Sequence, residues 1–201
     1  MELQLVGFSN SGKTTLIQYL TRELTKQGYR IGVIKHHHLP VPLDTPGKDS
    51  TTFLAAGAKA TALLSPLEMK VQVARPYSLR EMIANMYGVY GALDLLFIEG
   101  FKTESLPKLL LVRTKEEYQQ LKTCLNIQGV AVWPTFKCEA HLLEGRPLFS
   151  VQQPEDLLIW VQQRLHQEQS SRLPTSTKPH DARDRTPPIP LFKSSESPVE
   201  G

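Results

Sequence analysis

The chain has 201 residues, of which 40% are apolar, 21% charged and 7% aromatic. This is enough apolar material for the core of one ordinary domain, and two cysteines are too few for a disulfide scaffold. The 23 basic and 20 acidic residues give a net charge of +3, a balance that gives no sign of nucleic-acid binding. The N-terminus lacks the pattern of a secretory signal, and every apolar run is far shorter than the roughly 20 residues of a membrane-spanning helix. We therefore expect a cytoplasmic protein that binds neither membranes nor nucleic acids.

The composition divides the chain near residue 169. Residues 1–168 alternate strand and helix signals, whereas residues 169–201 are rich in Ser, Thr, Pro and charged residues and contain few apolar ones. Such a segment cannot bury enough apolar surface to offset the entropy lost on ordering, so we predict a disordered polar, Pro-rich tail. Its Pro187–Phe192 segment could dock on a partner, although a tail without a function is the simpler interpretation.

The first 168 residues predict an α/β domain. Strand-like apolar runs occupy the following segments: Glu2–Val6, Ile31–Lys35, Ala60–Leu64, Lys70–Arg75, Asp94–Glu99, Lys108–Arg113 and Val130–Trp133. An apolar stripe after Lys13 predicts a helix that stops near Gly28, and capping-box patterns begin further helices at Ser78 and Thr114. Pro154 opens a last amphipathic helix. Apolar strands with helices between them predict three α/β/α layers around a mainly parallel sheet.

A phosphate-binding loop is the sharpest signal. Residues 7–14 match the pattern G-x-x-x-x-G-K-[ST] at every fixed position, directly after an apolar strand and before an amphipathic helix. Gly7 and Gly12 permit backbone angles and a close approach that a Cβ would block, and the loop amides bind phosphate oxygens. Lys13 brings a cation to the β- and γ-phosphates, and Thr14 offers a hydroxyl to Mg²⁺. We therefore expect a P-loop NTPase domain.

A carboxylate on the magnesium side of this loop should lie at the C-terminal end of a neighbouring strand, because ligands of open α/β sheets bind outside that edge. The strand from Asp94 to Glu99 has an acid at each end. Asp94 begins the strand and lies roughly 16 Å from its other end at ~3.3 Å per residue. We therefore predict that Glu99 holds the metal or orients water, and that Asp94 is an ordinary surface carboxylate.

Three consecutive histidines, His36–His38, follow the second strand and should lie near the loop. Residues on an extended chain alternate faces, so all three cannot easily bind one ion. Contact with phosphate or substrate, metal ligation and a plain polar loop all stay open. Asp44–Gly47 spells D-x-x-G, a γ-phosphate sensor in GTPases, but no N-K-x-D motif follows and coincidence is the simpler explanation. Asp49 begins the next helical segment, where it could approach Mg²⁺.

Several motifs occur together in a recognisable order. They are Gly7–Thr15, Ile34–His38, Pro46–Ser50, Ala56–Ala58 and Asp94–Lys102. Together they resemble the molybdopterin-guanine dinucleotide biosynthesis protein B family (MobB), over roughly residues 2–168. The loop alone is shared by a very large superfamily, whereas this combination is much more specific. The polar tail is no part of the family pattern.

The resemblance implies a cytoplasmic, homodimeric GTP-binding protein with weak GTPase activity. Such a protein acts beside the molybdenum cofactor guanylyltransferase, which attaches GMP to molybdopterin, and a molybdopterin-type cofactor is a further possible ligand. The resemblance implies nucleotide contacts at the following positions: Gly7, Ser9, Asn10, Ser11, Gly12, Lys13, Thr14 and Thr15. We expect water to attack the γ-phosphate in line while Lys13 stabilises charge and Glu99 orients water or metal. Mg²⁺ would then lie among Thr14, Glu99 and Asp49.

Two other functions fit the same fold. A small-molecule kinase would need an acceptor site and an arginine-bearing lid, and the stretch Lys102–Leu109 could be a lid but contains no arginine. A non-catalytic adaptor would use the nucleotide only to stabilise a surface for its partner. Arg75 and Arg113 lie near predicted strand ends, but nothing in the sequence connects either to the loop.

Overall fold

The computed structural model describes residues 1–37, 49–91, 93–136 and 143–172. The D-x-x-G segment Asp44–Gly47, His38 and residues 173–201 of the predicted tail lie outside these ranges. The last described helix continues to Arg172, past the domain boundary expected at residue 168. Within the described ranges, no helix has the length and apolar character needed to span a bilayer.

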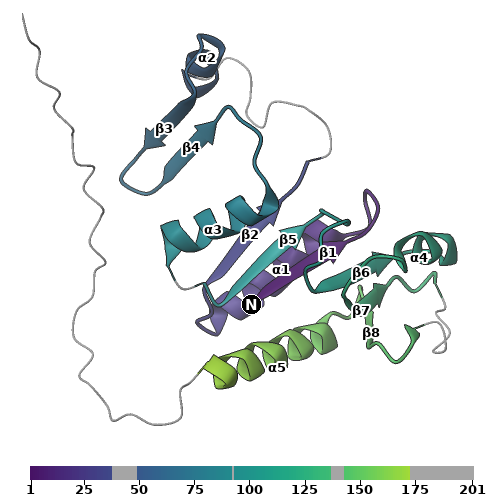
Figure 1. The fold of residues 1–201 in the computed structure, drawn as a ribbon. Coiled ribbons are helices and arrows are strands. Elements are labelled where there is room, and N and C mark those ends of the chain that lie inside the picture. The colour runs from purple at the N-terminus through teal and green to yellow at the C-terminus, as the bar shows by residue number, and fades with distance from the viewer. Residues whose placement is uncertain (38–48, 92, 137–142, 173–201) are drawn as a thin grey trace, which may run out of the picture.

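A six-stranded sheet with the order β2-β5-β1-β6-β7-β8 forms the centre of the molecule (Figure 1). Its strands are β1 (Glu2–Val6), β2 (Ile31–Lys35), β5 (Leu95–Glu99), β6 (Lys108–Val112), β7 (Ile127–Val132) and β8 (Leu148–Ser150). Every neighbouring pair is parallel, which confirms the predicted sheet. The short strand β8 was missed, because three residues are too few to show a periodic pattern.

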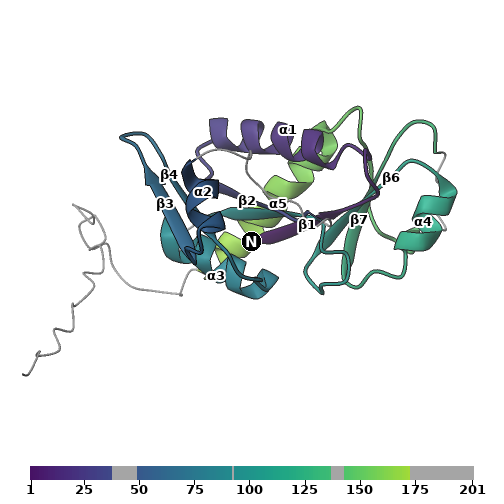
Figure 2. The same cartoon turned by 90° about the horizontal axis from the view of Figure 1, so that it is seen from above.

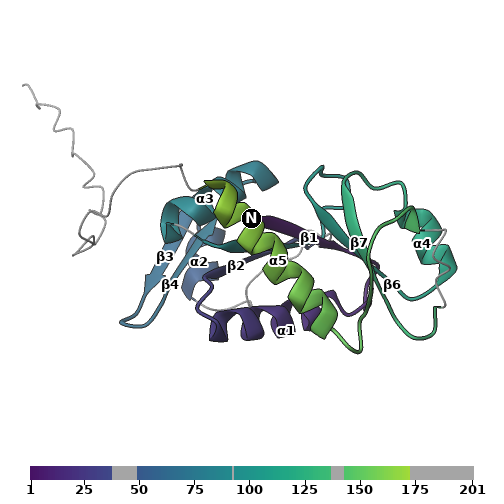
Figure 3. The same cartoon turned by 90° about the horizontal axis from the view of Figure 1, so that it is seen from below.

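Helices cover both faces of this sheet, which makes the predicted three layers. Helices α1 (Lys13–Lys26) and α5 (Glu155–Arg172) pack side by side on one face, where the apolar stripe of α1 is buried (Figure 3). Helices α3 (Leu79–Tyr90) and α4 (Lys115–Leu121) pack on the other face, so that α1 and α3 lie on opposite sides (Figure 2). Strands buried on both faces carry apolar residues almost continuously, as the sequence of β5 and β6 shows.

The predicted helix boundaries are formed by specific caps. Gly28 has a φ of 88°, and its amide donates to the carbonyl of Thr25 at 3.0 Å, which ends the first helix as predicted. The capping box between Ser78 and Glu81 is complete. The second predicted box is only half formed, because the carboxylate of Glu117 accepts hydrogen bonds from Arg113 instead of closing the box.

The strands β3 (Ala60–Leu64) and β4 (Met69–Val73) form a separate antiparallel hairpin, which stands with α2 (Asp49–Ala55) apart from the main sheet (Figure 1). The sequence predicted both strands but not this separation. Parallel neighbours need a crossover of about a dozen residues or more. The connection between β3 and β4 is short, so these two strands pair with each other.

Helix α5 offers a matched test of the core. Leu157 is completely buried, whereas Ile159 is 50% exposed on the same helix. We expect Leu157→Ala to lower the free energy of unfolding by about 2–5 kcal/mol, because it removes buried methyl groups and leaves a cavity. Ile159→Ala should change it by less than about 1 kcal/mol. Urea unfolding measures both, and equal losses would contradict the packing described.

Candidate functional site

The site lies at the carboxyl ends of β1, β2 and β5, where a pocket of about 710 Å³ opens. The loop between β1 and α1 forms one wall with the following residues: Gly7, Ser9, Asn10, Ser11, Gly12, Lys13, Thr14 and Thr15. The opposite wall consists of Lys35, His36, His37, Glu99 and Gly100. All the residues predicted to contact nucleotide therefore line one pocket.

The loop has the close backbone packing that the two glycines predict. A Cβ at Gly7 would lie 2.6 Å from both the Leu111 carbonyl oxygen and the hydroxyl of Ser11. Gly12 has a φ of 92°, and Asn10 adopts a φ of 59°, so the chain turns through left-handed conformations that larger residues disfavour. This cradle of backbone fits an anionic phosphate group, because successive amides and the start of a helix favour negative charge.

Lys13 begins α1, and its side chain reaches back over the loop. Its ammonium donates hydrogen bonds to the carbonyl oxygens of Phe8 at 2.7 Å and Gly7 at 3.0 Å. Burial lowers the pKa of Lys13; the negative charge of Glu99 opposes this effect, and the nearby cation Lys35 adds to it. A bound anion would favour the charged ammonium, so this environment suits phosphate.

Glu99 and Thr14 meet across the pocket. The Thr14 hydroxyl donates to the Glu99 carboxylate at 2.9 Å, although these residues come from α1 and β5. Glu99 is only 8% exposed. Asp94 lies at the other end of β5, where its carboxylate pairs with Arg30 at 3.2 Å. The structure thus places the strand-end acid, and not the strand-start acid, in the pocket.

Two contributors to the site were missed by the sequence analysis. Lys35 donates to the Thr14 hydroxyl at 3.1 Å and lies 3.4 Å from the Glu99 carboxylate. Because Lys35 ends a predicted strand beside the histidines, the strand-end argument used for Glu99 could have found it. The indole of Trp133 donates to the Ser11 carbonyl at 2.9 Å and packs under Gly12. No sequence pattern signals this contact, because it depends on the order of the strands.

The histidines and Asp49 were the remaining candidates for contact with metal or phosphate. The His36 ring stacks on Phe101 with 4.1 Å between ring centroids, and His37 is exposed at the pocket wall. In the part of the chain that the structure describes, no three His, Cys, Asp or Glu side chains lie close enough together to form a metal site from these side chains alone. Asp49 begins α2, but its side chain is outside the described part.

The two arginines form ion pairs with glutamates, and the suggested lid ends in a buried strand. Arg113 approaches the Asn10 carbonyl at 3.5 Å, but its guanidinium is bound to Glu117. Arg75 pairs with Glu81 at the start of α3. The suggested lid 102–109 ends in the buried strand β6, so its last part cannot open over the pocket.

The parallel sheet, with a phosphate loop between β1 and α1 and an acid at the end of β5, defines a protein with a P-loop NTPase-like α/β fold. Residues 2–133 match the family model described as "Molybdopterin guanine dinucleotide synthesis protein B". The chain belongs to this MobB family, and its role lies in the biosynthesis of molybdopterin guanine dinucleotide.

Individual relatives agree with this membership. The chain is 34% identical over 156 residues to the probable molybdopterin-guanine dinucleotide biosynthesis adapter protein of Bacillus subtilis (strain 168), covering 76% of this chain and 86% of the relative. It is 36% identical over 134 residues to the adapter protein of Escherichia coli (strain K12), covering 65% and 75%. The crystal structure of Bacillus subtilis MobB matches with a TM-score of 0.64 and 31% identity, covering 81% of this chain and 96% of that one. A MobB homologue from Bacillus stearothermophilus gives a TM-score of 0.65 and 27% identity, with 83% and 98% covered.

The contact between Trp133 and the loop can be tested directly. We expect Trp133→Phe to lower the free energy of unfolding by about 1 kcal/mol, because the Ser11 carbonyl loses its indole donor. The amides of residues 11–13 should also exchange faster with solvent. Trp160→Phe is the matched control, since Trp160 lies on α5 against Phe149. Hydrogen exchange and urea unfolding measure the effects, and unchanged exchange in Trp133→Phe would contradict this role.

Proposed function

We propose that this chain is an adapter protein that binds GTP with Mg²⁺ in the pocket of the phosphate loop and acts with the molybdenum cofactor guanylyltransferase. The observation that carries the proposal is the joining of Lys13, the backbone cradle and the Thr14–Glu99 pair in one pocket. The relatives named adapter proteins support the role. GTP is the nucleotide from which a guanine dinucleotide can be made.

The chemistry of the loop supports triphosphate binding. The Lys13 ammonium lies among the loop carbonyls at the pocket, where a bound phosphate would offer it charged acceptors. A phosphate oxygen carries negative charge whereas a carbonyl oxygen is neutral, so the ammonium interacts more strongly with phosphate. The loop amides and the start of α1 add favourable interactions with negative charge.

The same pocket offers oxygen ligands of the kind that Mg²⁺ prefers. The Thr14 hydroxyl and the Glu99 carboxylate lie 2.9 Å apart and would hold the ion together with phosphate oxygens. The bound ion would neutralise charge on the β- and γ-phosphates. Lys35, beside both groups, limits the net negative charge of the site.

GTP hydrolysis in this site should be slow. Water would attack the γ-phosphorus and break its bond to the β-phosphate oxygen, giving GDP and phosphate. Fast hydrolysis of this kind depends on an arginine that stabilises the transition state. Within the described residues, Arg113 contacts the loop, and its guanidinium is engaged by the Glu117 carboxylate. A slow GTPase suits an adapter better than it suits a kinase.

Lys13 gives the test of this proposal. We expect Lys13→Ala to weaken GTP binding by at least about tenfold, because the ammonium–phosphate bonds are lost. Lys26→Ala is the matched control at the last turn of the same helix, where Lys26 pairs with Glu23. Calorimetric titration with GTP and ATP, with and without Mg²⁺, measures affinity, and phosphate release on the same samples measures turnover. Wild-type affinity in Lys13→Ala would refute the assignment of the loop.

The hairpin supports the proposed homodimer. Side chains alternate along a strand, so alternate residues of β3 and their β4 partners share one face. That face is apolar and exposed, and it consists of Ala60, Ala62, Leu64, Met69, Val71 and Val73. A two-stranded hairpin is only marginally stable alone, and exposed apolar faces and edges favour pairing with another chain. We propose that the partner is a second copy of this chain, because every copy carries the same apolar face.

The dimer can be tested on this face. We expect Val71→Glu to convert a wild-type dimer into a monomer, because the new carboxylate would be buried in an apolar interface without a partner. Lys70→Glu places the same group on the opposite face and should leave the dimer intact. Light scattering after size-exclusion chromatography gives the mass of each protein. A monomeric wild type, or dimeric Val71→Glu, would overturn this part of the proposal.

A further inference from the structure

Lys108 is a buried lysine that the function described above does not use. It begins β6, and its side chain is 0% exposed. The ammonium donates to three neutral oxygens: Gln4 Oε1 at 2.7 Å, the Leu106 carbonyl at 3.2 Å and the Glu104 carbonyl. Burial lowers the pKa of Lys108, but the three acceptor oxygens match the three N–H groups of the charged ammonium. A fully buried lysine is rare. Its hydrogen bond to Gln4 offers an explanation for this one.

Gln4 of β1 connects Lys108 to the turn that follows β5. It is also 0% exposed. An ammonium can only donate hydrogen bonds, so the oxygen of the Gln4 amide must face Lys108. The amide nitrogen then faces the other way and donates to the carbonyl of Gly100 at 2.5 Å and to that of Phe101. Lys108 thereby fixes which end of the amide meets the turn.

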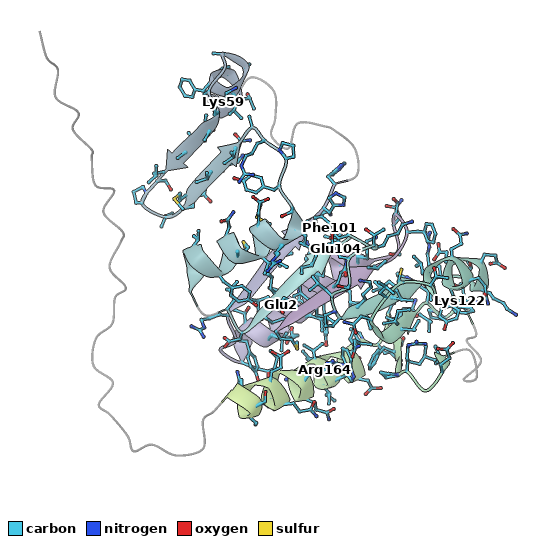
Figure 4. All side chains as sticks on the ribbon, in the orientation of Figure 1. Glu2, Lys59, Phe101, Glu104, Lys122 and Arg164 are labelled. Atoms are coloured by element: carbon cyan, nitrogen blue, oxygen red, sulfur yellow. The ribbon has the colours of Figure 1, made fainter. Side chains whose placement is uncertain are left out.

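The turn held in this way connects directly to the pocket. Gly100 and Phe101 have φ values of 98° and 53°, so two consecutive residues are left-handed and one of them has a side chain. The Phe101 ring stacks on His36, and Glu99 immediately before the turn accepts from Thr14. Figure 4 shows Phe101 and Glu104 close together beyond the end of β5. A change in the turn would therefore move groups of the pocket wall.

We propose that Lys108 and Gln4 are positioning residues that hold the turn at Gly100 and Phe101, and so set the place of Glu99 against Thr14. Neither residue is among those that line the pocket, so both act through the turn. The consequence for Mg²⁺ and GTP rests on the proposed function. The consequence for the turn itself does not, and it can be measured in the protein without ligand.

Gln4→Glu distinguishes a role of Gln4 in holding the turn from a role only in the stability of the core. It keeps the shape of the side chain and gives Lys108 a carboxylate, but it removes the donor and turns an acceptor toward two carbonyls. We expect the NMR signals of the His36 ring to lose the ring-current shift from Phe101. We also expect GTP affinity to fall about tenfold with Mg²⁺ present and less without it. Gln4→Met, which removes the donor without adding charge, should act in the same direction.

Gln128→Glu is the matched control, because Gln128 on β7 also presents its oxygen to a cation, Arg164, at 2.9 Å. It should leave the His36 signals unchanged. If Gln4→Glu does not fold, Gln4→Met decides the outcome. Unchanged His36 signals in the folded Gln4 variants would overturn the proposal. If the wild type binds no GTP, the proposed function fails, and the His36 signals still decide whether the turn is held as proposed.

Discussion

The parallel pairing of β1 between β5 and β6 is the constraint on which the site depends. It aligns Leu5 with Glu99, and the pairing of β2 with β5 aligns Lys35 with the same glutamate. Because all these strands run in one direction, their carboxyl ends meet at one edge. The phosphate loop leaves β1 at that edge. The backbone therefore places Thr14, at the start of α1, within hydrogen-bond distance of Glu99.

The electrostatics of the pocket follow from this arrangement. Glu99 is nearly buried, and the cations Lys13 and Lys35 surround it, while Arg113 is balanced by Glu117. Each buried charge would be costly alone, and the group is tolerated because the charges are paired or hydrogen-bonded. The remaining positive character lies at Lys13, at the start of α1. A triphosphate with its metal is the ligand class that this balance suits.

The proposed activities use separate parts of one chain. The pocket lies at the carboxyl edge of the main sheet, whereas the apolar face of the hairpin belongs to a second, smaller sheet. A subunit interface at the hairpin would leave the loop open to nucleotide and to a partner enzyme. Lys108 does not line the pocket. It lies in the core and acts on the pocket wall through Gln4 and the turn at Gly100 and Phe101.

The sequence by itself determined the phosphate loop, the strand before it, the helix after it, the family and the choice of Glu99 over Asp94. These features are local, since they depend on fixed spacing, on side-chain period and on which end of a strand a residue occupies. Only the tertiary structure decided that β3 and β4 form their own sheet, that Trp133 supports the loop and that Lys108 orients Gln4. The contacts of Trp133 and Lys108 join residues more than a hundred positions apart, through strand order and register that no local pattern encodes. The strands β3 and β4 are close in sequence, but whether they join the main sheet is decided by packing and not by their own pattern.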